Sequence, residues 1–259
     1  MPPHPARGLQ TVSRLLDGAV HHRDSLGSDD VIRPGELGLM TAGRAITHAE
    51  YSPAAHPSLL HGVQLWVALP GPDRMRCPAW EHHTDLPVLH ESGMTATVIL
   101  GTLAGALSPG RAYSPLVGVD VALDAGGTAL LPLEADFEHA VLVMSGAIEV
   151  DGVALAPGAM LYLGCGRRDL RMGSEAGARV LLLGGEPFAE ETVMWWNFVG
   201  RTGEEIAAAR GHWRTGRRFG AGADSGPPRP GPRPPPGRAP PGGPPRRRAP
   251  PAPTPPPTC

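Results

Sequence analysis

Short apolar runs, each closed by a glycine or proline turn, restrict this chain to antiparallel β structure. Leu9–Leu16, Gly62–Leu69 and Met94–Leu100 each have the length and composition of a strand. Asp-Gly and Pro-Gly pairs, which make tight turns, separate such runs at intervals of about ten residues. This spacing is typical of a β-sandwich or barrel, so we predict an all-β fold.

The two halves of the chain carry the same succession of elements: strand, glycine turn, strand, Pro-Gly turn, strand. We therefore predict two related β-barrels, residues 1–107 and 116–219, joined by Ser108–Pro115. The only convincing helix is Gly203–Trp213, which follows Thr202 as a candidate N-cap.

Composition excludes several classes of protein. Residues 220–259 are nearly all Pro, Arg, Gly and Ala, and we expect this tail to be disordered. The chain has 23 basic and 25 acidic residues, and six arginines lie in the tail, so the body is acidic and unsuited to nucleic acid. No apolar run approaches the ~20 residues of a membrane span, and no signal peptide is evident. We expect a cytoplasmic protein.

One pair of residues indicates a candidate metal site. His48 and Glu50 are two residues apart, and on a strand they project from the same face. An imidazole and a carboxylate side by side make half of a transition-metal site. His4 is a candidate for the other half, but the residue two positions further on is Ala6 rather than a second histidine.

The chain resembles the pirin family, bicupins of the cupin superfamily. The resemblance covers about residues 1–219, and it is specific because MTAGR…HAE and HGVQLW occur in this order. The matching segments are His4-Pro5, Gly8, Thr11-Val12, Asp17-Gly18, His22–Ser25, Pro34-Gly35, Met40–Arg44, His48–Glu50, His61–Val67, Gly185–Phe188 and Met194–Phe198.

The resemblance implies two cupin barrels packed face to face, with one non-haem iron(II) in the first. Three histidines and a glutamate hold that metal in the family, which gives His4, position 6, His48 and Glu50 here. Ala6 departs from this pattern, so we expect weak occupancy, by iron or another divalent metal, that Ala6→His would raise. Pirins also have several dozen residues before this strand, so we expect the first barrel to be incomplete and His4 to lie on a frayed terminus.

Each candidate has a structural alternative. His48 and Glu50 could form a hydrogen-bonded pair, and His4 could be a solvated terminal residue. The adjacent pairs His21-His22 and His82-His83 are interpreted as surface or loop residues. Gln64 could orient a metal ligand, although a sheet hydrogen bond is the favoured interpretation. His139, which lacks a neighbouring ligand, suggests that the second barrel is free of metal.

Two classes of function remain open. The resemblance implies an iron-dependent dioxygenase of the quercetin 2,3-dioxygenase type, weakened by Ala6 and acting on a small aromatic, flavonol-like substrate. Glu50 would be its catalytic base. The alternative is a non-catalytic regulatory or binding module with a protein partner. Metal content, followed by oxygen uptake with quercetin, separates the two.

Overall fold

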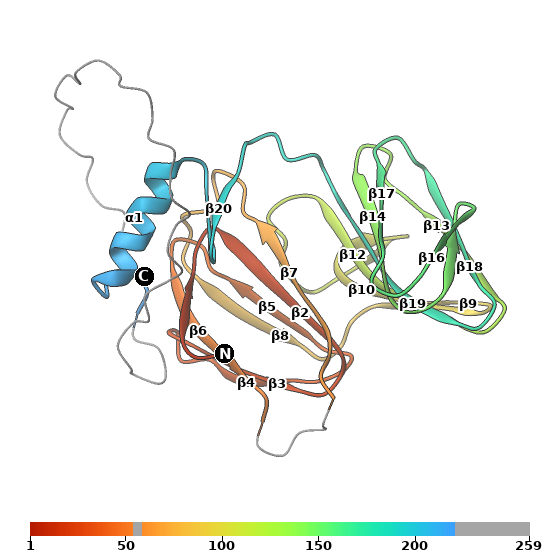
Figure 1. Cartoon of the computed structure of the whole chain (residues 1–259), viewed down its shortest axis with the longest axis horizontal. Helices are drawn as coiled ribbons and strands as arrows, with labels where there is room; N and C mark the ends of the chain where they lie inside the picture. Colours follow the sequence, from red (N-terminus) through yellow and green to blue (C-terminus); the bar gives the residue numbers. More distant parts are fainter. Residues whose placement is uncertain (54–58, 221–259) are drawn as a thin grey trace.

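The structure, a computed structural model, describes residues 1–53 and 59–220, so the predicted tail lies outside it from residue 221 onward. Two β-barrels lie side by side, the first red to orange and the second yellow-green to teal (Figure 1). Within the described ranges a single helix, α1, is present, and it lies beside the first barrel. The predicted all-β fold with a C-terminal helix is confirmed for the described residues.

Two four-stranded antiparallel sheets form the first barrel. The first sheet has the order β1-β6-β3-β4 and comprises β1 (His4–Ala6), β6 (Ile46–Tyr51), β3 (Val20–Asp24) and β4 (Asp29–Ile32). The second has the order β7-β2-β5-β8 and comprises β7 (His61–Ala68), β2 (Leu9–Asp17), β5 (Leu37–Thr41) and β8 (Ala79–His83). Leu9, Met40 and Ile46 meet between the sheets as part of the barrel core.

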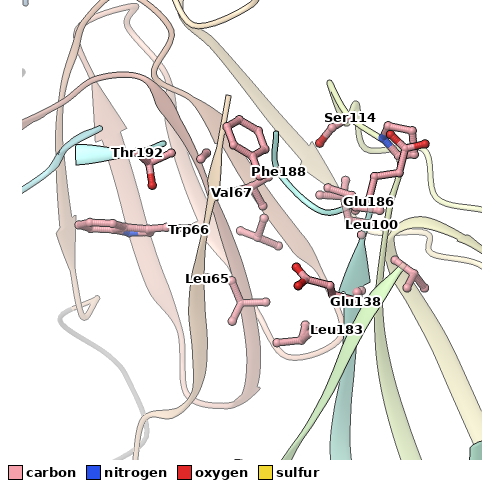
Figure 2. A pocket seen from close by; sticks show the side chains of 18 of the residues that line it. Leu65, Trp66, Val67, Leu100, Ser114, Glu138, Leu183, Glu186, Phe188 and Thr192 are labelled. Atoms are coloured by element: carbon pink, nitrogen blue, oxygen red, sulfur yellow. The ribbon is translucent and has the colours of Figure 1, made fainter. Parts of the chain in front are cut away.

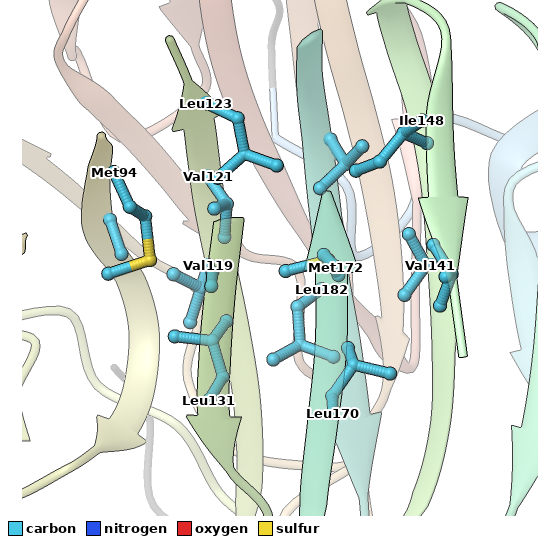
Figure 3. Packing of buried hydrophobic residues seen from close by; sticks show 14 of the residues in the cluster. Met94, Val119, Val121, Leu123, Leu131, Val141, Ile148, Leu170, Met172 and Leu182 are labelled. Atoms are coloured by element: carbon cyan, nitrogen blue, oxygen red, sulfur yellow. The ribbon is translucent and has the colours of Figure 1, made fainter. Parts of the chain in front are cut away.

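A seven-stranded and a four-stranded sheet form the second barrel. The larger contains β9 (Val88–Glu91), β10 (Met94–Leu103), β11 (Ala106–Leu107), β12 (Leu116–Leu123), β19 (Ala178–Gly185), β14 (Glu138–Gly146) and β17 (Met160–Gly164). The smaller contains β13 (Gly127–Pro132), β18 (Asp169–Ser174), β15 (Ile148–Val150) and β16 (Val153–Leu155). Figure 3 shows Val119, Val121, Leu170 and Leu182 in the core between these sheets. The strict alternation of buried and exposed residues along β13 explains why its apolar side chains reach this core.

Residues 88–107 differ from the predicted division of the chain. They were placed with the first barrel, but β10 pairs with β12, and Met94 and Val98 belong to the core of the second. The Pro- and Gly-containing segment Ser108–Pro115 is therefore a loop between two strands of one sheet. Its composition indicates a turn correctly, but composition does not reveal which strands the turn joins.

The barrels meet face to face through β2 and β5 of the first and β10 and β19 of the second. Val12, Leu37 and Leu39 pack there against Leu100 and Leu181. Because side chains alternate along β2, Val12 and Arg14 face the second barrel while Leu9 faces the interior of the first.

After β19 the chain returns to the first barrel. β20 (Val193–Trp195) and β21 (Phe198–Gly200) form a hairpin, and Phe198 bridges to Arg7 beside β1. Helix α1 (Gly203–Arg214) starts at Thr202, whose hydroxyl accepts a hydrogen bond from the Glu205 amide, as predicted for an N-cap. No helix among residues 1–53 and 59–220 has the length and apolar character needed to cross a membrane.

Candidate metal centre

His4 and His48 face each other across neighbouring strands. The β1–β6 register pairs these two residues directly, and their ring centroids are 4.0 Å apart. Glu50 lies two residues beyond His48 on β6 and projects from the same face. The local geometry predicted from the sequence for the His48–Glu50 pair is therefore present, on the face that lines the interior of the first barrel.

Both imidazoles are buried. His48 is only 2% exposed, and its Nδ1 has no hydrogen-bond partner among the described residues. Burial, followed by the charges of His4 and His22, holds the pKa of His48 well below its usual value. His4 has a lowered pKa for the same first reason, and its Nδ1 lies 2.9 Å from the carbonyl oxygen of Pro2. The expectation that His4 lies on a frayed terminus is wrong, because β1 is paired and buried.

Glu50 links the histidines to an open cavity. Its Oε1 accepts a hydrogen bond of 2.6 Å from Nε2 of Gln64, which also donates to Oγ of Ser13 at 3.2 Å. Glu50 and Gln64 line a cavity of about 400 Å³ whose apolar wall includes Leu15 and Val63. The side chain of Gln64 thus contacts both its cross-strand neighbour Ser13 and the carboxylate of a candidate ligand, the two roles weighed for it from the sequence.

His22 is the site residue that the sequence reasoning missed. It was interpreted as a surface or loop residue, but it is 1% exposed and lies on β3, directly across from Glu50. Its ring stacks on Trp80 at 3.7 Å and lies 5.8 Å from the ring of His48. Nε2 of His22 is 3.1 Å from Oδ2 of Asp24. The His22-x-Asp24 spacing, like His48-x-Glu50, was the available signal.

The other paired histidines do not join this group. His21 points to the opposite face of β3, is partly exposed and contacts Asp29 at 2.5 Å. His82 contacts Glu36, and His83 contacts Glu81, both from half-buried positions on β8. The interpretation as surface residues is thus wrong for His22, which is buried, whereas His21, His82 and His83 are partly exposed.

Ala6 lies in apolar surroundings. It is 1% exposed and belongs to a cluster with Leu9, Met40, Ile46 and Val199. Its partner across the strand pair is Ile46, two register positions away from His48. Position 6 thus contributes to the packed core of the barrel.

The donor types fit a divalent first-row metal, since imidazoles with a carboxylate are the ligands that iron, nickel and zinc accept in proteins. The buried, unpaired Nδ1 of His48 is an atom that such an ion could satisfy. As the side chains stand, no three His, Cys, Asp or Glu residues in the described part of the chain are close enough to hold an ion.

A larger cavity lies between the barrels. Its volume is about 690 Å³, and Figure 2 shows Leu65, Val67 and Phe188 facing Leu183 and Glu138 across it. It is mainly apolar and contains none of the candidate ligands. Volume alone would therefore select this cavity, whereas the candidate ligand Glu50 lines the smaller one.

The second barrel has one buried histidine at its mouth. His139 is 1% exposed, and neither ring nitrogen has a partner among the described residues. It lines a cavity of about 150 Å³ with Glu134, and no other histidine lines that cavity. The expectation that this barrel is free of metal stays a prediction.

Comparison with known proteins identifies relatives of both barrels. The sequence pattern of the family described as Pirin matches residues 1–67, and that of the Pirin C-terminal cupin domain matches residues 118–220. A Pseudomonas aeruginosa protein named "Putative quercetin 2,3-dioxygenase PA1205" is 48% identical over 219 residues, which cover 84% of this chain and 69% of that protein. A pirin-like protein of Caulobacter vibrioides is 39% identical over 220 residues, 83% of this chain and 75% of that one.

Solved structures agree. A crystal structure of quercetin 2,3-dioxygenase from Acinetobacter baumannii superposes with a TM-score of 0.86 at 38% identity, covering 92% of this chain and 80% of that one. The bacterial pirin YhhW from Escherichia coli, solved in complex with nickel(II), superposes with a TM-score of 0.59 at 22% identity, covering 71% and 76%, and supports the fold alone. On these matches, and with two cupin barrels in the structure, the chain belongs to the pirin family.

Proposed function

We propose that the first barrel binds one divalent metal ion, iron(II), through His4, His48 and Glu50, and that the chain is an oxygenase of the quercetin 2,3-dioxygenase type. One observation carries the proposal. Two imidazoles, tilted by 54°, have ring centroids 4.0 Å apart, and a carboxylate on the same strand face lines a cavity. The names of the Pseudomonas and Acinetobacter relatives support this choice of reaction.

When bound, the iron would supply the binding and activation of dioxygen beside the substrate. The protein contributes the rest. Two histidines and one carboxylate leave coordination positions open for substrate and oxygen. Leu15, Val20 and Val63 give the cavity an apolar wall suited to a flat aromatic ring. Glu50, at its edge, is placed to accept the proton of a flavonol hydroxyl.

Gln64 gives this base a fixed position. Its amide donates to Glu50 and to Ser13, so the carboxylate oxygen Oε1 is held on the cavity side of β7. Groups that orient a metal-binding carboxylate in this way commonly govern both affinity and activity.

A second candidate function is a non-catalytic binding module with a protein partner. The observation that favours it is the lack, among the described residues, of three donors already close enough to hold an ion. A barrel that never binds metal would keep the fold and its surfaces while lacking oxygenase chemistry.

The test is to load the metal-free protein anaerobically with iron(II), dialyse it, and measure iron per chain and then oxygen uptake with quercetin. We expect one bound iron and quercetin-dependent uptake. His48→Ala should lose both, Glu50→Gln should lose uptake, and His21→Ala, on the opposite strand face, should retain both. A parent protein that holds no iron would contradict the proposal and favour the binding module.

A further inference from the structure

We propose that His22 supplies a third imidazole to the metal site, in place of the histidine that position 6 lacks. The inference rests on the proposed metal site in the first barrel. It assigns a ligand from a third strand, β3, whereas the sequence pattern draws ligands only from β1 and β6.

The position of His22 on the sheet supports this assignment. Strand β6 lies between β1 and β3, so His4 and His22 approach His48 from opposite sides. The register pairs His22 with Glu50 and Asp24 with His48, which puts all of these side chains on the same interior face. The sheet thereby gathers three imidazoles around one carboxylate.

The ring distances are compatible with a shared ion. Metal–nitrogen bonds of ~2.1 Å place two imidazole centroids within about 6 Å of each other when both bind the same metal. The centroids of His22 and His48 are 5.8 Å apart, and those of His4 and His48 are 4.0 Å apart. These spacings let the strands stay in place, and the rings that would rotate toward a shared ion are those of His4 and His48, because Asp24 and Trp80 hold the ring of His22.

The hydrogen bonding of His22 suits a ligand. Its Nε2 donates to Oδ2 of Asp24, which leaves Nδ1 to carry the lone pair. A metal-binding histidine commonly donates its other N–H to a carboxylate in this way, which fixes its tautomer and orientation. Asp24 is itself fixed, because its Oδ1 accepts from the amides of Leu26 and Ser28. Trp80 holds the ring plane from the other side.

Position 6 has no room for the third imidazole. Ala6 packs against Leu9, Met40 and Ile46, so an imidazole there would have to displace core side chains. His22 is already buried in the interior, and the ring nitrogen that contacts Asp24 is Nε2. The sequence led us to expect that Ala6→His raises iron occupancy. With His22 as the third imidazole, we expect instead that Ala6→His leaves iron occupancy unchanged.

The experiment titrates Co²⁺ into metal-free full-length protein by calorimetry and records the absorption bands of bound Co²⁺. Four variants are compared with the parent: His22→Ala, His22→Phe, His48→Ala and His21→Ala. His22→Phe keeps an aromatic ring against Trp80 but has no nitrogen. We expect both His22 variants to bind Co²⁺ about 100-fold more weakly with altered bands. His21→Ala, at a partly exposed position on the opposite face, should match the parent.

A direct count of imidazoles complements the affinities. Electron spin-echo modulation of the Cu²⁺-loaded protein should report three imidazoles in the parent and two in His22→Phe. If the parent binds no metal, the proposed function fails. If the parent binds Co²⁺ and loses it in His48→Ala, yet His22→Phe binds with parental affinity and an unchanged imidazole count, the inference about His22 alone is overturned.

Discussion

A buried ion pair joins the two barrels, and breaking it should cost more than any surface contact. Asp120 on β12 is 1% exposed and accepts from Nε and Nη2 of Arg14 on β2, each at 2.9 Å. It also accepts from Nε and Nη2 of Arg179 at 2.7 Å. Arg14 is 3% exposed, and its Nη1 already lacks a partner among the described residues. Asp120→Ala would therefore leave a guanidinium buried without its counter-charge.

Removing one partner of a buried pair costs about 3–5 kcal/mol of unfolding free energy, because the remaining charge stays desolvated. For a chain of this size, we expect a fall of about 10 °C in melting temperature. Arg179→Ala should cost only about 1 kcal/mol, because that side chain is 35% exposed and water screens its charge. Replacing both buried partners, Arg14→Met with Asp120→Leu, should recover most of the loss.

Acid should weaken the same contact. Burial raises the pKa of Asp120, but the hydrogen bond and charge of Arg179 and the charge of Arg14 outweigh it, so the folded pKa lies below the usual value. The stabilisation is therefore present above the unfolded pKa of about 3.9 and is lost as pH falls through the lower folded value. Urea unfolding at pH 7 and pH 3 measures this. A cost for Asp120→Ala no larger than that for Arg179→Ala at pH 7 would refute the reasoning.

Four further substitutions test the packing and the site. Gly8→Ala should cost at least about 2 kcal/mol in urea unfolding, because φ is +75° and a Cβ would lie 2.1 Å from a backbone oxygen of β21. Gly105→Ala, with φ of +81° and open space around it, should cost about half as much. Ala6→His should lower the melting temperature through overpacking worth about 1–3 kcal/mol, and an unchanged melt would contradict the buried cluster. Gln64→Leu should reduce quercetin-dependent oxygen uptake about 10-fold, because it frees the Glu50 carboxylate; undiminished uptake would show that the amide does not position the base.

The features that could be predicted from the sequence are those that neighbouring residues determine. The predicted strand Leu9–Leu16 is observed as Leu9–Asp17, and the helix starts after the predicted N-cap Thr202, because turn residues and caps act within a few positions. The shared face of His48 and Glu50 follows from the two-residue period of a strand.

Long-range pairing accounts for what the sequence did not show. His22 looked exposed because both members of an adjacent pair cannot face one side, and only the pairing of β3 with β6 reveals which member is buried. β10 was assigned to the first barrel because a Pro- and Gly-containing segment follows it, although its partner is β12. The contact of Arg14 with Asp120 spans 106 positions, so no local pattern could have indicated it.

The central claim is that a metal ion binds in the first barrel at His48. The most direct measurement is anomalous diffraction from crystals of the full-length protein grown with nickel(II) or iron(II). We expect one strong anomalous peak about 2.1 Å from nitrogen atoms of His4 and His48, with Glu50 as a further ligand. A peak that is absent from the first barrel, or that lies only in the cavity between the barrels, would contradict the account.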